Sequence, residues 1–518
     1  MKPAIEVAIR KGEYHDSVML MRVSEEVKKI EGIEEAAVLM ATDTNKKALE
    51  DIGLLTADIG GAGPNDLVIV VKALSKDSAK RAMLKVEELF KRKPAKGVEA
   101  EYKSLNSALM EMQDANIAII SVPGEFAAWE AEKALRRKLN VFMFSSNVSI
   151  EDEVRLKKLA RDEGLLMMGP DCGTAIINGV GLGFANIVNE GPIGVVGAAG
   201  TGTQEVTSIV STESGISHAI GTGGRDLNER VGGIAMIEGI RALNEDSGTQ
   251  VIVLIAKRPS PPVERAVLEV AEKCKKPVVV YFAGGDPSTV CKAGAVPAIT
   301  LEETAYKALA LAKNTKYVGS SFTMPIRDVD LLAKKEYSKF DKGQKYIRGL
   351  FSGGSFCSEA VMLLSGLVGD VYSNVASKPS LGLKDANISY RHSCIDLGDE
   401  EFVRGRAHPM IDMSLRQQRI VKEARDPETA VILLDVVLGL GAHRDPASAL
   451  TPAIEEAKAV AKKDGRHLSI VASICGTDKD PQDKKGQVKK FGEAGVLLMP
   501  SNAQATRMAA LIARSGKV

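Results

Sequence analysis

The sequence predicts a multidomain α/β protein built mostly on parallel sheets, and three observations carry this prediction. Short apolar runs alternate with helix-like stretches along nearly the whole chain of 518 residues. Several runs are apolar at every position, which is typical of strands covered by helices on both faces. The 48 glycines stand mostly just after these runs, as in sheets with tight turns at their strand ends. The strand-like runs are residues 5–9, 37–40, 67–71, 117–121, 141–144, 193–196, 251–256, 278–282, 431–437 and 469–474.

Composition narrows the class of protein. Lys and Arg number 68 against 67 Asp and Glu, a net charge of +1, so neither a nucleic-acid-binding basic field nor an acidic tail is expected. The six cysteines are scattered without a C-x-x-C pair, which favours reduced thiols in a cytoplasm. No run approaches 18 apolar residues and the N-terminus lacks the apolar core of a signal peptide. We therefore expect a soluble cytoplasmic protein without a membrane span.

The length predicts three or four domains at roughly 150 residues each. Residues 1–94 read β-α-β-α-β-α and close with a basic stretch before Pro94, which marks a first boundary. A second joint follows Val318, where Gly-Ser-Ser precedes Pro325 and a charged stretch with little periodicity. The predicted parts are 1–95, 96–190, 191–318, a linker at 319–343, and 344–518.

An internal repeat is the strongest signal in the sequence. Residues 193–206 can be aligned with residues 347–360, which matches Gly200 to Gly354 and Glu205 to Glu359. Two related β-α units predict a pseudo-two-fold axis, with the strand ends of both halves facing a shared crevice. The alternative is a chance similarity of glycine-rich turns.

One glycine turn predicts an anion site. A strand that ends in glycines and runs into a helix leaves backbone N–H groups unpaired at the positive end of the helix dipole. Gly200, Thr201, Gly202 and Thr203 fit this pattern, but they form neither a Walker A loop nor the dinucleotide G-x-G-x-x-G spacing. An empty tight turn is the alternative.

A second turn has the same form. Gly439 and Gly441 follow a long apolar run, and His443 and Arg444 add two donors. Arg444 could bind a pair of carboxylate or phosphate oxygens, whereas a surface arginine after a turn is the alternative.

Several charged residues are further candidates. Lys257 directly follows a strand-like run, and Lys292 lies in Cys-Lys-Ala-Gly; both would be ordinary solvated lysines if they have no role. Residues 396–412 hold charges of both signs and a histidine. Such side chains are costly to bury, so they are expected to face either solvent or a functional site. We expect a site there, with Arg404, Arg406 and His408 as candidates for binding a substrate carboxylate or for proton transfer.

Metal binding and thiol catalysis are not expected. His408 with Asp412, and His443 with Asp445, lack a third ligand at a defined spacing. Cys291 lacks a convincing histidine partner for nucleophilic catalysis.

Three segments after about residue 116 carry a family resemblance: Met168-Gly-Pro-Asp171-Cys-Gly, Gly200-Thr201-Gly202-Thr203 and residues 439–444. Through them this part of the chain resembles the succinyl-CoA synthetase superfamily. In that superfamily two helix N-termini face each other across a phosphate. The resemblance implies a truncated Rossmann-like domain of CoA-binding type at 96–190 and two flavodoxin-like, synthetase-type domains at 191–318 and 344–518.

Four further motifs are spread over nearly the whole length of the chain: Pro64-Asn65-Asp66, Asp396-Leu-Gly-Asp399, Gly405-Arg406-Ala407-His408-Pro409-Met410-Ile411-Asp412 and Leu434-Asp435-Val436-Val437-Leu438-Gly439. Through these motifs the chain resembles the FdrA family. This resemblance implies a subunit of an oxamate carbamoyltransferase in allantoin catabolism, which uses phosphate to cleave oxalurate into oxamate and carbamoyl phosphate.

Departures from the synthetases shape the expected chemistry. The synthetase relay needs a phosphorylated histidine in G-H-A-G-A, where this chain reads Cys291-Lys292-Ala-Gly-Ala295. The glutamate that orients that histidine would fall near Lys257. No ATP-grasp domain is expected, and no glycine-rich CoA loop precedes residue 116, so CoA is not an expected cofactor.

The sequence thus predicts phosphate or carbamoyl phosphate between the turns at 200–203 and 439–444, with Lys257 and Lys292 as neutralising charges. No cofactor and no covalent intermediate are required. Expected partners are small anions such as phosphate, oxamate and oxalurate, other subunits of the same enzyme, and a second copy of the chain. The alternatives are an acyl-CoA synthetase or CoA-binding protein of the same fold, and a non-enzymatic scaffold.

Overall fold

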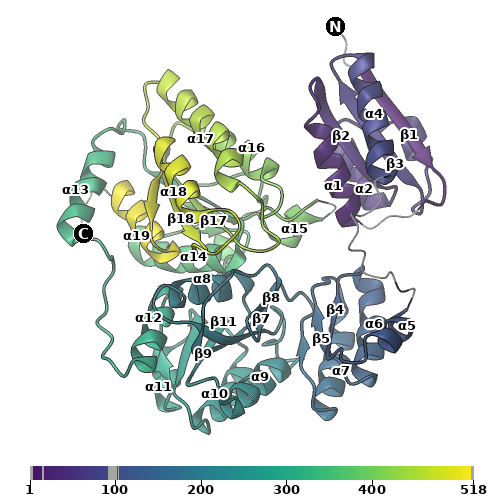
Figure 1. Cartoon of the computed structure of the whole chain (residues 1–518). Helices are drawn as coiled ribbons and strands as arrows, with labels where there is room; N and C mark the ends of the chain where they lie inside the picture. Colours follow the sequence, from purple (N-terminus) through teal and green to yellow (C-terminus); the bar gives the residue numbers. More distant parts are fainter. Residues whose placement is uncertain (1–3, 14–16, 92–101, 103, 405, 515–518) are drawn as a thin grey trace. The chain divides into compact units, whose positions relative to one another are not determined.

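A computed structural model of the chain describes residues 4–13, 17–91, 102, 104–404 and 406–514. The chain divides into two compact units (Figure 1). One contains Met1–Lys103 with Glu400–Ala407, and the other contains Ser104–Asp399 with His408–Val518.

The smaller unit is a three-stranded sheet covered by helices. Its central strand is apolar and buried, and one hydrophobic cluster lies on each of its faces. The elements are β1 (Ala4–Arg10), α1 (Ser17–Lys28), β2 (Ile33–Met40), α2 (Asp43–Asp51), α3 (Ala57–Gly60), β3 (Leu67–Ala73), α4 (Lys76–Lys91) and α15 (Glu400–Val403).

The sheet of this unit is antiparallel, unlike the mostly parallel sheets that the sequence predicts. The strand order is β1-β3-β2, and β3 runs antiparallel to both neighbours. β1 and β2 are joined through α1 and run in the same direction, with β3 inserted between them. This is a split β-α-β arrangement.

The larger unit begins with a small parallel sheet of order β4-β5-β6. Helix α6 packs against β5 through a face of buried alanines. Ser149 caps α7 by accepting the Asp152 N–H. The elements are α5 (Leu105–Glu111), β4 (Ile117–Ile120), α6 (Gly124–Arg136), β5 (Asn140–Met143), α7 (Ile150–Asp162) and β6 (Met167–Met168).

A seven-stranded sheet follows, in the order β13-β12-β11-β9-β10-β7-β8. Five strands are parallel, and the hairpin of β7 and β8 extends the sheet antiparallel beyond β10. The elements are β7 (Thr174–Ile177), β8 (Val180–Gly183), β9 (Glu190–Gly197), α8 (Gly200–Val210), β10 (Ile216–Gly221), α9 (Ile234–Glu245), β11 (Val251–Lys257), α10 (Pro261–Glu272), β12 (Val278–Ala283), α11 (Pro287–Lys292), β13 (Val296–Pro297) and α12 (Leu301–Ala312).

The last sheet is six-stranded and entirely parallel, in the order β15-β16-β14-β17-β18-β19. Every residue of its strand β17 is buried, as expected for a strand covered on both faces. The elements are α13 (Ile326–Tyr337), β14 (Tyr346–Phe351), α14 (Gly354–Val368), β15 (Tyr372–Ser373), a 3-10 helix (Pro379–Leu381), β16 (Ser393–Asp396), α16 (Ser414–Ala424), β17 (Thr429–Val437), α17 (Pro446–Lys463), β18 (Ser469–Cys475), α18 (Lys484–Glu493), β19 (Leu497–Met499) and α19 (Asn502–Ala513).

The two large sheets share one topology. Apart from the hairpin of β7 and β8 in the first sheet and the short strand β15 in the second, both have the chain order 2-1-3-4-5 of flavodoxin-like folds: β10-β9-β11-β12-β13 and β16-β14-β17-β18-β19. The predicted fold class is confirmed. Each of the ten strand-like runs coincides with a strand, and the runs 117–121 and 141–144 extend one residue past the strand end. Residues 319–343, expected as a linker, include α13, which packs against α19.

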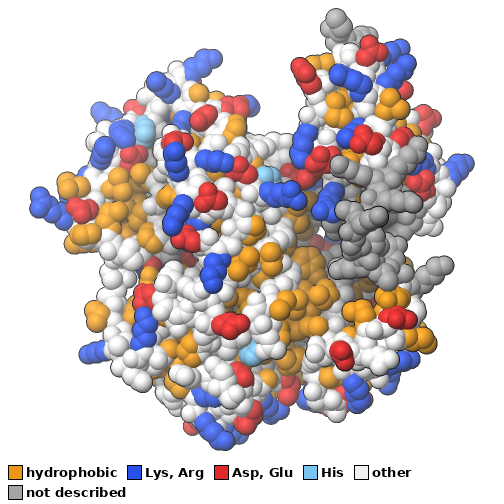
Figure 2. All heavy atoms as spheres, in the orientation of Figure 1, with side chains coloured by type: hydrophobic (Ala, Val, Ile, Leu, Met, Phe, Trp, Pro, Cys, Tyr) orange, Lys and Arg blue, Asp and Glu red, His pale blue; other side chains and the backbone are white. Residues whose placement is uncertain are grey.

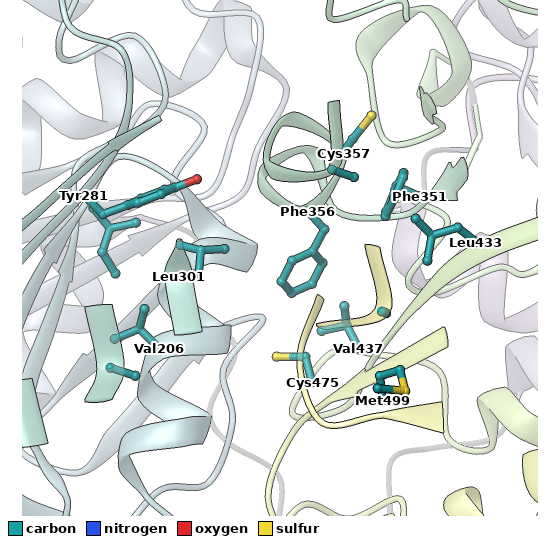
Figure 3. Packing of buried hydrophobic residues seen from close by; sticks show 14 of the residues in the cluster. Val206, Tyr281, Leu301, Phe351, Phe356, Cys357, Leu433, Val437, Cys475 and Met499 are labelled. Atoms are coloured by element: carbon teal, nitrogen blue, oxygen red, sulfur yellow. The ribbon is translucent and has the colours of Figure 1, made fainter. Parts of the chain in front are cut away.

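Helices α8, α12, α14 and α19 pack together between the two large sheets (Figure 1). Their apolar residues form one continuous core with strands of both halves. In Figure 3, Val206 and Leu301 of the first half and Phe356, Val437 and Met499 of the second belong to this core. The two halves therefore fold against each other.

A pair of buried glutamates joins the halves reciprocally. Glu205 of α8 accepts the backbone N–H of Asn502, the first residue of α19, at 3.0 Å. Glu359 of α14 accepts the N–H of Leu301, the first residue of α12, at 2.7 Å. Each glutamate thus binds an orphan N–H group at the start of a helix in the other half. The residues that the repeat aligns occupy equivalent positions about the pseudo-two-fold.

A buried lysine fixes the small parallel sheet to the first half. Lys157 of α7 donates to Glu153 at 2.9 Å, to Asp226 at 2.8 Å and to the carbonyl of Thr222 at 2.9 Å. Asp226 also accepts two N–H groups at the start of α9. All three charged side chains are fully enclosed.

Two observations concern the surface. On the face shown in Figure 2, basic and acidic side chains are interspersed among the described residues. In the part of the chain that the structure describes, no helix has the length and apolarity needed to cross a membrane.

Candidate functional site

The first turns of α8 and α14 are in direct contact. A Cβ atom at Gly353 would lie 2.8 Å from Thr201 Oγ1, and one at Gly202 would lie 3.4 Å from the Cβ of Ser355. The absence of a side chain at Gly353 leaves room for Thr201. Neither helix has a side-chain cap at its N-terminus, so α8 and α14 begin side by side with uncapped N–H groups. The positive ends of two helix dipoles therefore come together here.

A cationic cleft of about 690 Å³ opens at the carboxyl ends of β9 and β11. In flavodoxin-like sheets this is the topological switch point, where ligands bind. Arg225, Arg230, Lys257 and Arg258 line it, together with Ala198 from the turn before α8.

The cations of the cleft are not equivalent. Arg225 pairs with Glu153 at 3.0 Å, and Arg230 pairs with Glu151. Within the described residues, Lys257 and Arg258 have no ion-pair partner. They are also exposed, so they are the charges available to an anion.

Asp396, the last residue of β16, lies at the start of α14. Its side chain is 5% exposed, and Oδ1 accepts the N–H of Gly398 at 3.0 Å. Oδ2 faces Gly354, where a Cβ atom would lie 2.6 Å away. Burial raises the pKa of Asp396 to about 7, although the nearby charge of Lys257 acts in the opposite direction. The charges of Lys257 from the first half and Asp396 from the second therefore interact where the two halves adjoin.

The turn before α14 already holds a carboxylate. Asp435 of β17 accepts the N–H groups of Ser352 at 2.8 Å and Gly353 at 2.9 Å, and it pairs with buried Arg416 at 3.0 Å. Arg416 also donates to the carbonyl of Leu350. This network fixes the second turn, whereas no side-chain carboxylate binds the α8 turn within the described residues. The free anion-binding capacity thus lies on the α8 side.

His408 is partly buried against the turn that follows Asp396 and does not line the cleft. Its ring packs on Phe184, with centroids 5.7 Å apart, and Nε2 lies against Gly398. Nδ1 accepts the Met410 N–H at 3.2 Å. Burial lowers the pKa of His408 to about 4, so the ring is neutral at pH 7 and supports the turn after Asp396.

The turn at 439–444 is occupied by protein groups. The N–H of Gly439 donates to Gln482, that of Leu440 to the carbonyl of Ala185, and that of His443 to the carbonyl of Met410. Gly439 and Gly441 adopt φ values of +116° and +77°, and both pack closely against residues 184–185.

The helix that follows this turn carries its own cap. Asp445 accepts the Ser448 N–H at 3.1 Å and pairs with Lys490, which holds the pKa of Asp445 well below its usual range against the effect of partial burial. Arg444 is exposed. These hydrogen bonds favour α14, rather than the turn at 439–444, as the counterpart of α8. A phosphate-binding role for Gly439, Gly441, His443 and Arg444 stays a prediction.

The remaining candidates lie in different places. Thr203 is buried, and its hydroxyl donates to the Ala199 carbonyl at 2.9 Å, whereas Gly200 and Thr201 are partly exposed. Lys292 ends α11 and is exposed near Asp286, whose pKa is lowered mainly by hydrogen bonds from Ser288 and also by Lys292 and Arg258.

Two predicted residues belong to the other unit. Arg404 and Arg406 lie in the segment that groups with the N-terminal domain, and both are exposed. Arg404 pairs with Glu400 at 3.2 Å.

Sequence reasoning placed Asp396 in a charged stretch where a site is expected but gave it no role, and it did not assign Asp435, Arg416 or Gly354 to a site. The repeat held the signal for one of them, because it aligned Gly354 with Gly200. The second helix start could have been placed at Gly354 on that ground.

Three family models match the chain. They are described as "AllF, heavy metal-associated domain" over residues 1–105, "CoA binding domain" over residues 188–284, and "CoA-ligase" over residues 350–512. The last two fall on the two flavodoxin-like halves. Fold and matches together define a succinyl-CoA synthetase-like protein.

Curated relatives agree with this class. "Uncharacterized protein YahF" of Escherichia coli K12 is 44% identical over 501 residues, which is 96% of each chain. The α subunit of succinate–CoA ligase from Methanothermobacter thermautotrophicus is 30% identical over 188 residues, 35% of this chain and 62% of that one. The same subunit from Staphylococcus epidermidis is 31% identical over 176 residues, 33% and 57% of the two chains. The chain belongs to the YahF family of succinyl-CoA synthetase-like proteins.

Solved structures align at low scores. The PH0766 protein of Pyrococcus horikoshii covers 83% of this chain and 90% of its own, with 14% identity and a TM-score of 0.34. A dinucleotide-forming acetyl-coenzyme A synthetase 1 from Ca. Korarchaeum cryptofilum covers 77% and 84%, with 15% identity and a TM-score of 0.29.

The N-terminal domain does not fit a heavy-metal ion. Such ions prefer thiolate ligands, but the first cysteine of the chain is Cys172, outside the matched residues 1–105. Among the described residues, no group of three or more His, Cys, Asp or Glu side chains could hold a metal.

The start of α6 is packed closely against the loop that follows β5. A Cβ atom at Gly124 would lie 2.3 Å from the carbonyl oxygen of Ser146 and 2.6 Å from that of Asn147, so only glycine fits at this position.

Proposed function

We propose that the chain is an FdrA-like subunit of an oxamate carbamoyltransferase and holds phosphate or carbamoyl phosphate at the start of α8. One observation carries the proposal: the uncapped first turn of α8 adjoins a cleft whose unpaired cations are Lys257 and Arg258. N–H groups of Gly200, Thr201 and Gly202 would bind the oxygens. The match to the AllF domain and the FdrA motifs support the link to allantoin catabolism.

The proposed reaction needs no covalent enzyme intermediate. A phosphate oxygen attacks the carbamoyl carbon of oxalurate, the C–N bond breaks, and oxamate and carbamoyl phosphate leave. Donors at the start of α8 stabilise the negative charge that develops on the carbamoyl oxygen. Lys257 neutralises the dianion, and Arg258 is placed to bind the carboxylate of oxamate. Lys292, at the position of the synthetase histidine, adds positive charge near Asp286.

Phosphate binding tests the site directly. Lys257→Ala is expected to weaken phosphate binding by about tenfold or more, because a full charge beside the dianion is lost. Isothermal titration of the full chain measures this. Lys273→Ala is the matched control, since Lys273 is an exposed lysine of the same half at the other end of α10. Equal phosphate affinity of the wild type and Lys257→Ala would contradict the site.

Turnover tests the reaction. The chain, co-purified with its partner subunits, is incubated with oxalurate and phosphate, and carbamoyl phosphate is measured. Absence of product with a subunit set that binds phosphate would reject carbamoyl transfer.

A second candidate is an acid–CoA ligase-like activity, which the CoA-ligase and CoA-binding matches favour. Incubation with labelled ATP and CoA separates it from carbamoyl transfer. Phosphorylated protein or an acyl-CoA product would support the ligase. Failure to bind any of these anions would favour a scaffold.

A further inference from the structure

The mechanism leaves one buried acid unused at the seam of the two halves. Asp396 ends β16, its Oδ1 is bound by Gly398, and its Oδ2 points at Gly354. Within the described residues, no donor is bound to Oδ2. A side chain that is 95% enclosed and keeps one oxygen unbound, at an uncapped helix start, is arranged for a ligand rather than for the fold.

Charged and titratable groups on several different elements interact electrostatically with Asp396. Lys257 comes from β11 of the first half, Asp435 from β17, Asp399 from the following turn, and the thiol of Cys357 from α14. Burial is the main cause that raises the pKa of Asp396 to about 7, Asp399 and Asp435 add to it, and Lys257 opposes it. The acid and its carboxylate are therefore both populated near neutral pH, which is the condition for efficient proton transfer.

We propose that Asp396 is the catalytic acid–base residue of the carbamoyl transfer, an assignment that rests on the proposed function. In the direction of oxalurate cleavage, the phosphate oxygen forms a bond to the carbamoyl carbon while the C–N bond breaks. The leaving nitrogen takes the proton of the Asp396 carboxyl group, which yields the neutral amide group of oxamate and an Asp396 carboxylate. The proton that hydrogen phosphate loses as it becomes carbamoyl phosphate returns Asp396 to its acid form. In the reverse direction this carboxylate accepts the proton from the amide nitrogen as the nitrogen attacks carbamoyl phosphate.

The protonated acid also suits an anion at the same place. A neutral Asp396 beside the start of α14 can donate to a phosphate oxygen, whereas an ionised one repels it. The proton on Asp396 and the bound anion are therefore coupled.

Two variants separate this role from a structural one. Asp396→Asn keeps the size of the side chain and an acceptor for the Gly398 N–H but carries no transferable proton. Asp396→Glu keeps the proton. Asp385→Asn is the matched control, because Asp385 is an exposed acid of the same half that accepts the Asn387 N–H.

With the complete set of subunits, Asp396→Asn is expected to lower kcat at pH 7 by about a hundredfold or more, with KM for phosphate little changed. The limb of the pH–rate profile that reports this acid should disappear. Asp396→Glu should restore part of kcat, and Asp385→Asn should retain it. If the Asp396→Asn variant keeps the wild-type kcat and pH profile, the assignment is overturned.

A binding experiment distinguishes failure of the assignment from failure of the proposed function. Inorganic sulfate is used because it stays dianionic between pH 6 and 8.5. Wild-type affinity for sulfate should fall about tenfold over this range as Asp396 ionises, while Asp396→Asn should show no such fall. An inactive wild type that still shows this difference would reject carbamoyl transfer but keep the coupling of Asp396 to the anion. The same pH dependence in both proteins would refute the coupling, whatever the turnover.

Discussion

Replacing Glu205 by glutamine should remove a pH-dependent loss of stability. Burial raises the pKa of Glu205 from its ordinary value of 4.5 to about 7, and the charges of Glu359 and Glu302 add to this effect. Between these two pH values the folded chain binds more protons than the unfolded chain. The contribution of Glu205 to the free energy of unfolding therefore falls as pH rises through this window and is lowest above pH 7.

The magnitude follows from the two pKa values. A pKa that rises from 4.5 to about 7 corresponds to about 3 kcal/mol, at about 1.4 kcal/mol per unit of pKa. Glutamine keeps an acceptor for the Asn502 N–H and carries no titratable proton. The difference in unfolding free energy between Glu205→Gln and wild type should thus shift by about 3 kcal/mol in favour of the variant from pH 4.5 to pH 8.

Denaturant unfolding of both proteins at a series of pH values measures this shift. All other carboxyl groups are present in both proteins, so the difference reports Glu205 together with its electrostatic coupling to Glu359 and Glu302. Glu359→Gln should behave in the same way, because burial also raises the pKa of Glu359 to about 7. Parallel stability–pH curves for wild type and Glu205→Gln would refute the reasoning.

Two further predictions concern packing. Lys157→Met should destabilise the larger unit by about 3 to 5 kcal/mol in denaturant unfolding, because Asp226 would remain buried without its cation and Glu153 would keep only Arg225; a loss below about 1 kcal/mol would contradict this account. Gly353→Ala should cost about 1 to 3 kcal/mol, because its Cβ atom would meet Thr201 at 2.8 Å, while the backbone φ of −107° suits any residue. Thr201→Ala should relieve part of this cost in a double-mutant cycle, and additive costs would exclude the contact as its cause.

Much of the fold could be predicted from local pattern. Fully apolar runs such as residues 251–256 and 431–437 predict strands covered on both faces, and the structure confirms them. The repeat predicted equivalent halves, which the shared strand order bears out. The direction of β3 could not be predicted, because a helix between two strands does not fix which neighbour the next strand pairs with.

The candidate site was harder to predict, because its hydrogen bonds come from distant segments. The glycines at 439 and 441 look free in sequence, yet their turn is bound by Ala185, Gln482 and Met410. The charged stretch around His408 suggested a site, but the histidine packs on Phe184 and its lowered pKa leaves it neutral at pH 7. The acid that reaches the helix start is Asp396, twelve residues earlier, and sequence spacing alone does not indicate which of these two side chains faces the seam.

The exchange of glutamates between the halves has a consequence for assembly. If the two halves were separate polypeptides, each would depend on an equal supply of the other. Any excess copy would carry a helix start without its acceptor and an acid with nothing to bind. Because both halves are translated as one chain, they are always made in a one-to-one ratio.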